Sequence, residues 1–274
     1  MSQQDIVYTL DIKKVQGKVL EIFVEFDRIC RKHNLRYSME GGTLMGAVKY
    51  GGFVPWDDDV DVIMPREDYE QFLKVAPQET DQRFFLQSYN NVSQFPLNYA
   101  KFCLTSTKIR NYAYSHLDQM HHGIFIDIFP IDNVKPGSYK LQCAFAGALT
   151  ASRSLKLKVI QIKGLKGLLY RCISVLPVGL LNKGIQFFCT LNNKKTTPLR
   201  YEVCNPNMKF PPLPYKLYEE YTELVFEGRK FFAVKDYDYF LKTRFGENYM
   251  NELPPEELRY PSHGYDIWFE EDEV

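Results

Sequence analysis

An acidic run near position 60 leads directly into an apolar strand and constrains the fold more than any other segment. Trp56-Asp57-Asp58-Asp59 is followed by Val60-Asp61-Val62-Ile63-Met64. Alternate side chains of a strand share a face, so Asp59 and Asp61 are predicted to point together while Val60 enters the core. Two adjacent carboxylates in one site require a cation, and their oxygens favour Mg²⁺ or Mn²⁺. Such ions usually complete their coordination with substrate phosphates, which indicates a nucleotide or another phosphate ester as substrate.

A glycine pair precedes this acidic run. Residues 36–40 have the pattern of a short strand, and Gly41-Gly42-Thr43 then turns the chain into a helix. Exposed amide groups at the start of that helix are suited to phosphate oxygens, with Thr43 as the helix cap. A Gly-Gly pair alone is more often only a turn. The carboxylates that follow favour the phosphate-binding interpretation.

A third carboxylate lies in a second apolar stretch, residues 123–132. Asp127 has six apolar neighbours there, and an unpaired buried charge is costly, so it requires a metal or a cationic partner. The alternative is a buried carboxylate satisfied by an arginine or by backbone amides. Asp132 competes for the same role, but it follows Pro130 and is predicted to lie past the strand end, where it would equally cap a turn.

Together these segments resemble the LicD family of phosphotransferases, distant relatives of fukutin-type enzymes within the nucleotidyltransferase-fold superfamily. The resemblance rests on residues 41–48, 51–62, 64–69 and 123–132, with a closing region at 245–255. It implies an α/β (α+β) fold in which a nucleotidyltransferase-like mixed sheet is flanked by helices. Because a glycine turn, an acidic-apolar-acidic pair and a third acid define the superfamily pattern, the resemblance implies metal-binding and catalytic roles for Asp59, Asp61 and Asp127. The longer gap after Gly42 leaves Asp57 or Asp58 as alternative ligands.

The resemblance also implies a reaction. Phosphocholine or a similar phospho-alcohol would pass from CDP-choline, or a related CDP-alcohol, to a hydroxyl of a cell-envelope glycan such as teichoic acid or a lipopolysaccharide precursor, with release of CMP. Mg²⁺ or Mn²⁺ would neutralise the pyrophosphate. Asp127 is a candidate proton acceptor, although a metal-bound carboxylate is a weak base. Lys101, in a strand predicted near 98–102, or Arg66 would add positive charge, and a surface ion pair is the alternative for both.

Choline itself would require aromatic faces, because a quaternary ammonium group donates no hydrogen bond. Aromatic residues make up 15% of the chain, and Trp56 lies beside the acidic run. A second aromatic group occurs near the C-terminus: Tyr260, His263, Tyr265, Trp268 and Phe269. Aromatic side chains are core material first, so ordinary packing is the alternative for both.

The distribution of charge predicts three regions: a catalytic core at 1–134, a basic amphipathic helical segment at 135–200, and a C-terminal region at 201–274 that packs on the core. Residues 133–201 contain no Asp or Glu but many Lys and Arg. Basic amphipathic helices, here broken at Pro177, favour peripheral contact with an anionic membrane. The alternative is a helical subdomain whose positive face binds phosphates or another part of the protein. Motif spacings for nucleic-acid binding are missing, so no nucleic-acid partner is expected.

The periodicity of apolar residues predicts the remaining helices. Helices are predicted at 11–33, from about 66, through much of 135–195, and at 236–245, with a proline-rich loop passage at 198–214. The first residues lack the pattern of a signal peptide, and the six cysteines are scattered without paired motifs. These features favour a cytoplasmic protein, placed at the inner face of the plasma membrane if its acceptor is lipid-linked.

Two alternative functions remain open at this point. One is a nucleotidyltransferase that attaches the nucleotide itself to a small molecule or a protein, since the same carboxylates serve that chemistry. The other is a non-catalytic membrane-associated scaffold that keeps the fold alone. The intact set of carboxylates argues against the scaffold.

Overall fold

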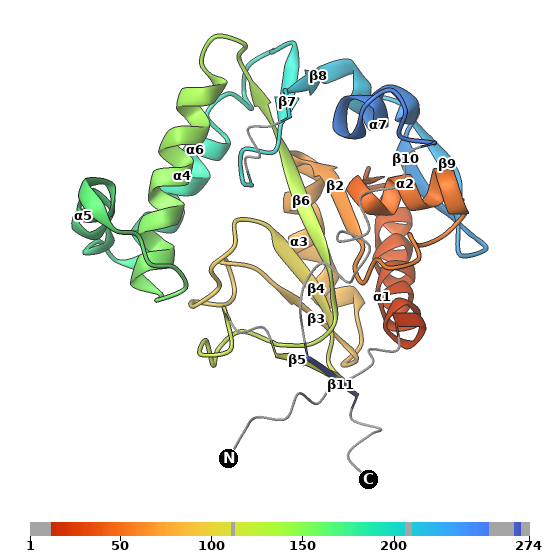
Figure 1. Cartoon of the computed structure of the whole chain (residues 1–274), viewed down its shortest axis with the longest axis horizontal. Helices are drawn as coiled ribbons and strands as arrows, with labels where there is room; N and C mark the ends of the chain where they lie inside the picture. Colours follow the sequence, from red (N-terminus) through yellow and green to blue (C-terminus); the bar gives the residue numbers. More distant parts are fainter. Residues whose placement is uncertain (1–11, 111–112, 206–209, 252–265, 270–274) are drawn as a thin grey trace.

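A central mixed sheet organises the protein in the computed structural model, which describes residues 12–110, 113–205, 210–251 and 266–269 (Figure 1). Its strands, in spatial order, are β1 (Ser38–Met39), β2 (Asp61–Pro65), β6 (Phe125–Val134), β4 (Ala100–Leu104) and β3 (Phe84–Gln87). The pair β2 and β6 is parallel, and the other pairs are antiparallel. Two short strands, β7 (Leu199–Tyr201) and β8 (Leu213–Pro214), extend the sheet from the end of β6. The predicted α/β fold with a mixed sheet and flanking helices is confirmed.

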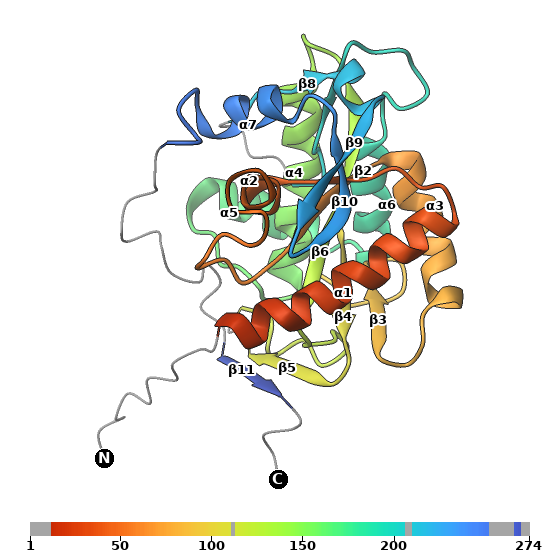
Figure 2. The same ribbon diagram turned by 90° about the vertical axis from the view of Figure 1, so that its right-hand side faces the viewer.

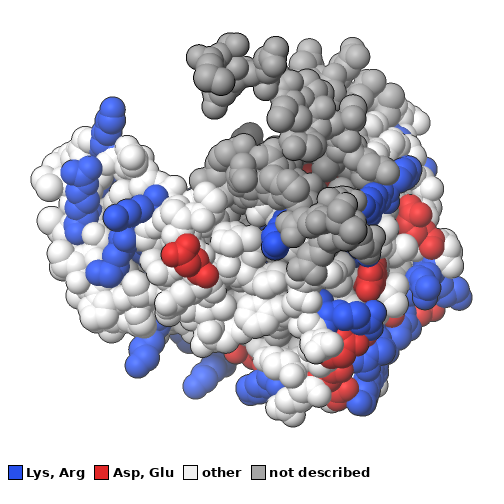
Figure 3. All heavy atoms as spheres, turned by 90° about the horizontal axis from the view of Figure 1, so that it is seen from below, with Lys and Arg blue, Asp and Glu red and all other residues white. Residues whose placement is uncertain are grey.

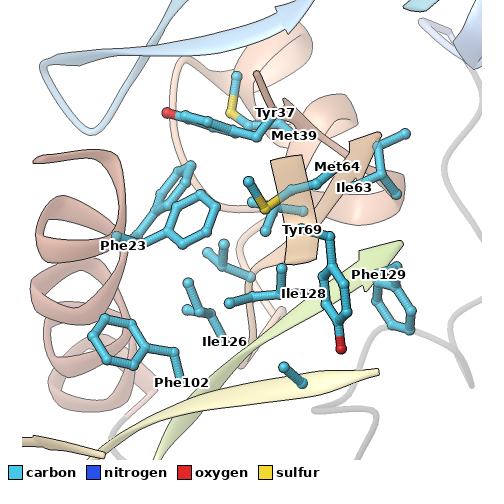
Figure 4. Packing of buried hydrophobic residues seen from close by; sticks show 14 of the residues in the cluster. Phe23, Tyr37, Met39, Ile63, Met64, Tyr69, Phe102, Ile126, Ile128 and Phe129 are labelled. Carbon is cyan, nitrogen blue, oxygen red and sulfur yellow. The ribbon is translucent and has the colours of Figure 1, made fainter. Parts of the chain in front are cut away.

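Helices α1 (Ile12–Lys32) and α3 (Arg66–Glu79) pack against the sheet and against each other (Figure 2). The apolar stripe of α1 is buried, as its three-and-four spacing predicts. Figure 4 shows Phe23 of α1, Phe102 of β4 and Ile126 and Ile128 of β6 around the same core. This packing fixes β2 and β6 relative to each other, and both carry carboxylates at the same sheet edge.

A hairpin that the sequence analysis did not predict covers the other side of α1. Strands β9 (Tyr221–Phe226) and β10 (Arg229–Val234) pair through the two-residue turn Glu227-Gly228. Both turn residues have positive φ, 49° and 72°, which matches the twist that a two-residue hairpin requires. The backbone N–H of Glu227 donates to Gly51 O at 2.9 Å, and its side chain accepts from the N–H of Phe53 at 3.1 Å. The hairpin therefore holds the loop that leads into the acidic run.

The basic segment forms a separate helical layer at one edge of the molecule (Figure 1). It consists of α4 (Tyr139–Lys156), α5 (Gly164–Ser174) and α6 (Val178–Cys189), and the break at Pro177 is as predicted. Within the described part of the chain, no single helix is long and apolar enough to cross a membrane; α5 and α6 together are, but they are bent by 111° at their break. The domain boundaries at 134 and 200 stay a prediction.

The remaining elements are short. Helix α2 (Gly41–Tyr50) follows β1, the 3₁₀ helix η1 (Tyr215–Tyr218) precedes the hairpin, and α7 (Tyr237–Phe245) follows it, close to the expected 236–245. A second two-stranded sheet pairs β5 (Thr107–Arg110) with β11 (Asp266–Phe269).

Candidate active site

Parallel pairing of β2 and β6 brings two predicted carboxylates side by side. Asp61 is the register partner of Asp127, and the N–H of Asp127 donates to Val60 O at 3.0 Å. Val60 is fully buried, as predicted. Asp61 is the first residue of β2, whereas Asp127 is the third residue of β6 and lies among buried residues. The two residues are therefore neighbours in the sheet, and their shared site stays a prediction.

Asp61 lies in a strongly negative environment. Burial raises the pKa of its carboxyl well above the usual range, and the charges of Asp59, Asp127, Glu40 and Asp57 raise it further. Among the residues that the structure describes, none of the ion pairs involves Asp61. A buried carboxylate surrounded by like charges is a place where a divalent cation binds favourably.

Asp127 differs because it already has a cationic partner. Lys101, opposite it in the antiparallel register of β4, donates from Nζ to Asp127 Oδ1 at 2.6 Å. The same Nζ lies 3.0 Å from the ring centroid of Phe125. Lys101 was predicted to lie near the phosphates in this sheet, and the structure places it in a buried ion pair rather than in the surface pair considered as its alternative.

The acidic loop supplies further oxygens. Asp57, Asp58 and Asp59 each offer a carboxylate oxygen, and these oxygens lie within 4.8 Å of one another. The prediction that Asp59 and Asp61 alternate along one strand was wrong, because β2 begins only at Asp61 and Asp59 lies in the preceding loop. Hard oxygen donors from Asp57, Asp58, Asp59 and Asp61 fit Mg²⁺ or Mn²⁺. Asp57, Asp58, Asp59, Asp61 and Asp127 are called the carboxylate cluster below.

The glycine turn lies against this cluster. Gly41 has φ of +52°, and a Cβ added at Gly42 would lie 2.5 Å from Asp57 Oδ2. Both glycines therefore let the backbone approach the carboxylates closely. Thr43 does not cap the helix as predicted, because α2 begins at Gly41 after Glu40. Its Oγ1 instead accepts the N–H of Asp61 at 2.9 Å and so ties α2 to the start of β2.

Two predicted residues lie in a different contact. Arg66 Nε and Nη2 donate to the two carboxylate oxygens of Asp132 at 2.8 and 2.7 Å, and both side chains are buried. Asp132 was expected past the strand end, but it lies inside β6 and also accepts from Asn193 at 2.6 Å. With its fork occupied by Asp132, Arg66 serves to join α3 to the sheet, and the structure does not bring it to the carboxylate cluster.

The aromatic candidates are only partly described. Trp56 is half-buried in the turn before the acidic run. Tyr260, His263 and Tyr265 lie outside the described residues. Trp268 and Phe269 belong to β11, whose backbone pairs with β5. The predicted C-terminal aromatic group therefore stays a prediction.

A cavity of about 210 Å³ opens beside Asp61, and the sequence analysis did not identify its other walls. Glu40 and Gly41 form one side, and the remaining lining comes from β6 and the C-terminal third of the chain: Phe129, Tyr201, Glu202, Asn205, Phe210, Arg244 and Phe245. Arg244 Nη2 donates to Glu202 at 2.5 Å and to Glu40 at 3.2 Å. No local pattern could have revealed this group, because Glu40 and Arg244 are 204 positions apart.

Two carboxylates thus share one guanidinium group. Burial raises the pKa of Glu40 well above its usual value, and the charge of Glu202 adds to this against the lowering effect of Arg244. The pKa of Glu202 is raised as well, again chiefly by burial. Glu40, whose pKa is raised further, is the first of the two carboxylates to take up a proton, and the charges of Glu202 and Arg244 then balance.

Comparison with known proteins agrees with this geometry. Residues 34–146 match the family described as LicD/FKTN/FKRP, nucleotidyltransferase domain. Over 270 aligned residues the chain is 30% identical to the lipopolysaccharide cholinephosphotransferase LicD of Haemophilus influenzae, covering 93% of this chain and 96% of that protein. The chain belongs to the LicD family. An uncharacterized protein of Rickettsia prowazekii is also similar, with 25% identity over 142 residues, which cover 47% of this chain and 52% of that protein.

The LicD-family domain match covers the carboxylate part of the candidate site. Residues 34–146 contain the glycine turn, the carboxylate cluster and Lys101. Glu202, Phe210, Arg244 and Phe245 lie C-terminal to the match, although they line the same cavity as Asp61. This LicD-family protein therefore combines carboxylates from the matched domain with a wall contributed from outside it.

Proposed function

We propose that this LicD-family protein is a metal-dependent transferase that moves phosphocholine from CDP-choline to a hydroxyl of a cell-envelope glycan and releases CMP. The named relative in Haemophilus influenzae is a lipopolysaccharide cholinephosphotransferase, which favours a lipopolysaccharide precursor over teichoic acid as acceptor. One observation carries the proposal: Asp61 is surrounded by carboxylates and has no cation of its own among the described ion pairs. We place the protein in the cytoplasm, at the inner face of the plasma membrane.

The carboxylate cluster provides the binding side of this chemistry. Asp59 and Asp61, assisted by Asp57 and Asp58, would hold Mg²⁺ or Mn²⁺, and a divalent ion there neutralises negative charge on the phosphates. The start of α2 places backbone N–H groups of Gly41 and Gly42 next to the same carboxylates, where they are suited to phosphate oxygens. Lys101 adds an ammonium group within the same cluster.

Asp127 is the residue that we assign to accept the proton of the attacking hydroxyl. The neighbouring ammonium of Lys101 favours the ionised carboxylate, which is the form able to take up a proton. After uptake the proton would reside on the Asp127 carboxyl, while the alcohol oxygen bonds to phosphorus and CMP departs. Removal of Lys101 should therefore affect the turnover rate and its pH dependence as well as binding.

The cavity beside Asp61 is the proposed place for the choline group. Its aromatic lining, Phe129, Tyr201, Phe210 and Phe245, offers ring faces and edges, and the carboxylate of Glu202 lies in the same wall. A quaternary ammonium ion binds through aromatic faces and a nearby negative charge rather than through hydrogen bonds. A neutral alcohol such as glycerol gains neither effect.

Turnover of a panel of CDP-alcohols tests the proposal. With Mn²⁺ and a lipopolysaccharide-type acceptor, the purified protein should convert CDP-choline to CMP and attach phosphocholine to the acceptor. Phe245→Leu should raise KM for CDP-choline by roughly two- to fivefold, as expected for a lost cation–π contact of about 0.5–1 kcal/mol at an exposed ring. KM for CDP-glycerol should barely change. The matched control is Phe85→Leu, an exposed phenylalanine on β3.

The same assay separates the alternatives. A nucleotide found on the acceptor would indicate a nucleotidyltransferase, which the fold of the matched domain also accommodates. No turnover of any nucleotide, under conditions where Mn²⁺ binds, would contradict catalysis and favour the scaffold.

A further inference from the structure

Helix α5 exposes nearly all of its apolar residues. Of its eleven residues only Gly167 is buried. Leu165 is 85% exposed, Leu168 59% and Leu169 57%. A surface helix of a globular protein normally buries such a stripe against the core, and this helix does not. The side chains that should drive the packing of α5 face outward instead.

The exposed residues form one stripe with basic residues on both flanks. At 100° per residue, Leu165, Leu168, Leu169 and Cys172 fall within one arc of the helix. Lys166 lies at one border of that arc and Arg171 at the other, and both are exposed. This is the arrangement of a helix that lies in an interface between water and an apolar phase.

Exposed apolar residues also occur just after α5 and on α6. Val175, just after α5, is 75% exposed, and Leu180 and Phe187, one face of α6, are 52% and 58% exposed. Scattered exposed apolar residues are common on protein surfaces, but a contiguous group usually marks a binding site. Leu165, Leu168, Leu169, Val175, Leu180 and Phe187 are called the docking surface below.

The helical segment that carries the docking surface is basic throughout. Residues 133–201 contain no Asp or Glu, and their Lys and Arg side chains are exposed except for Arg153 and Arg200. In Figure 3 the lobe on the α5 side shows Lys and Arg among uncharged residues, while Asp and Glu gather mainly toward the other end. A partner for this surface must therefore combine an apolar interior with a negative boundary.

We propose that the docking surface binds the protein peripherally to an anionic lipid bilayer. A bilayer meets both requirements, because its acyl region accepts the leucines and its anionic headgroups attract Lys166 and Arg171. The 111° bend between α5 and α6 at Pro177 keeps the pair from forming one spanning helix. Both helices pack on α4 instead and leave apolar residues exposed. This inference deepens the proposed placement at the plasma membrane, and its test measures no turnover, so its failure is distinguishable from a failure of the proposed transferase activity.

The exposed Cys172 provides a direct probe of this contact. It lies within the apolar stripe of α5, and the other five cysteines are buried, so a thiol-reactive, environment-sensitive dye should label it selectively. Addition of phosphatidylcholine vesicles containing phosphatidylglycerol should shift the dye emission to the blue. The same dye on Val225→Cys in a Cys172→Ser background, at an exposed site on β9, should not respond.

Vesicle flotation of the full chain quantifies the binding. Wild-type protein should float with phosphatidylglycerol-containing vesicles and far less with phosphatidylcholine alone. Leu165→Ser with Leu169→Ser should reduce binding at least tenfold, and Lys166→Glu with Arg171→Glu at least as much, since each basic residue near an anionic surface contributes about fivefold. Val225→Ser and Lys74→Glu, exposed sites on β9 and α3, are the matched controls.

Three results would overturn the proposal. The first is no flotation of the wild type with anionic vesicles. The second is unchanged flotation of the Leu165/Leu169 variant. The third is a dimer by light scattering that this variant converts to a monomer while vesicles bind neither form, which would assign the surface to a second copy of the chain. The substituted leucines are exposed, so unchanged thermal unfolding should verify that each variant is folded.

Discussion

Replacement of Asp61 by asparagine should stabilise the protein without metal and remove its response to metal. The amide is nearly isosteric with the carboxylate but carries no charge. In the folded protein, burial and the carboxylates of Asp59, Asp127, Glu40 and Asp57 disfavour the ionised form of Asp61. Among the neighbouring charges, that of Asp59 has the largest effect.

The expected magnitude follows from Coulomb's law. Two carboxylates about 5 Å apart repel by about 3 kcal/mol at an effective dielectric constant of about 20. The acidic loop is partly exposed, so solvent reduces this to roughly 1–3 kcal/mol. For a chain of this size, each kcal/mol corresponds to about 2–4 °C in Tm. Asp61→Asn should therefore raise Tm in the presence of EDTA by about 2–10 °C.

Bound Mn²⁺ should reverse the order of stability of the wild type and Asp61→Asn. At an excess of about a hundredfold over Kd, Mn²⁺ stabilises the wild type by about 2.7 kcal/mol, or roughly 5–10 °C. Asp61→Asn should lose most of that gain. Differential scanning fluorimetry with EDTA or MnCl₂ measures both effects, and Asp118→Asn, an exposed carboxylate outside the carboxylate cluster, is the control. A variant less stable than the wild type in EDTA, or equally stabilised by Mn²⁺, would refute the assignment of Asp61.

Three further predictions concern pH, an ion pair and a close contact. Because the pKa of Asp61 is raised in the folded state, the native protein binds a proton that the unfolded chain has already lost. The stability of the wild type in EDTA should therefore fall relative to that of Asp61→Asn as pH rises from about 4 through the folded-state pKa. A constant Tm difference across this pH window would contradict the prediction. Asp132→Asn should lower the free energy of unfolding in urea by about 3–5 kcal/mol, because it leaves the buried Arg66 guanidinium without its carboxylate. The double variant Arg66→Met with Asp132→Leu should recover part of this loss. Equal losses in both variants would indicate that packing dominates. Gly46→Ala should destabilise the protein by about 1–3 kcal/mol, because its Cβ would lie 2.4 Å from Gly52 O. Gly17→Ala, at an exposed position of α1 with no atom within 4 Å of the added Cβ, should be neutral or stabilising by up to about 1 kcal/mol. Similar unfolding curves for the two variants would contradict this.

The sequence predicted the parts of the fold that local patterns encode. Helix α1 follows from its apolar spacing, the break before α6 from Pro177, and the neighbouring positions of Asp61 and Asp127 from two acidic positions in apolar strands. The hairpin of β9 and β10 was missed, although apolar residues on both sides of Glu227-Gly228 offered a usable signal. Its strands mix exposed and buried residues, which weakens alternation.

Contacts between distant segments explain the remaining errors. Arg66 and Asp132 are 66 positions apart, and only the folded arrangement of α3 against β6 reveals that they pair. Thr43 had the residue type of a helix cap, but its hydroxyl oxygen accepts a hydrogen bond from the N–H of Asp61 instead. Glu40, Glu202 and Arg244 come from three separate regions, so no window of sequence contains them together.

The Glu40–Arg244 contact also has a consequence for the order of events during synthesis. Almost the entire chain must be synthesised before Arg244 of α7 can contact Glu40 at the start of α2. The cavity therefore cannot form on a nascent chain that contains only the matched domain. Until that moment the carboxylates near the glycine turn lack their opposite wall. Proteolytic removal of the C-terminal quarter would likewise leave the carboxylate cluster in place but remove one wall of the cavity beside Asp61.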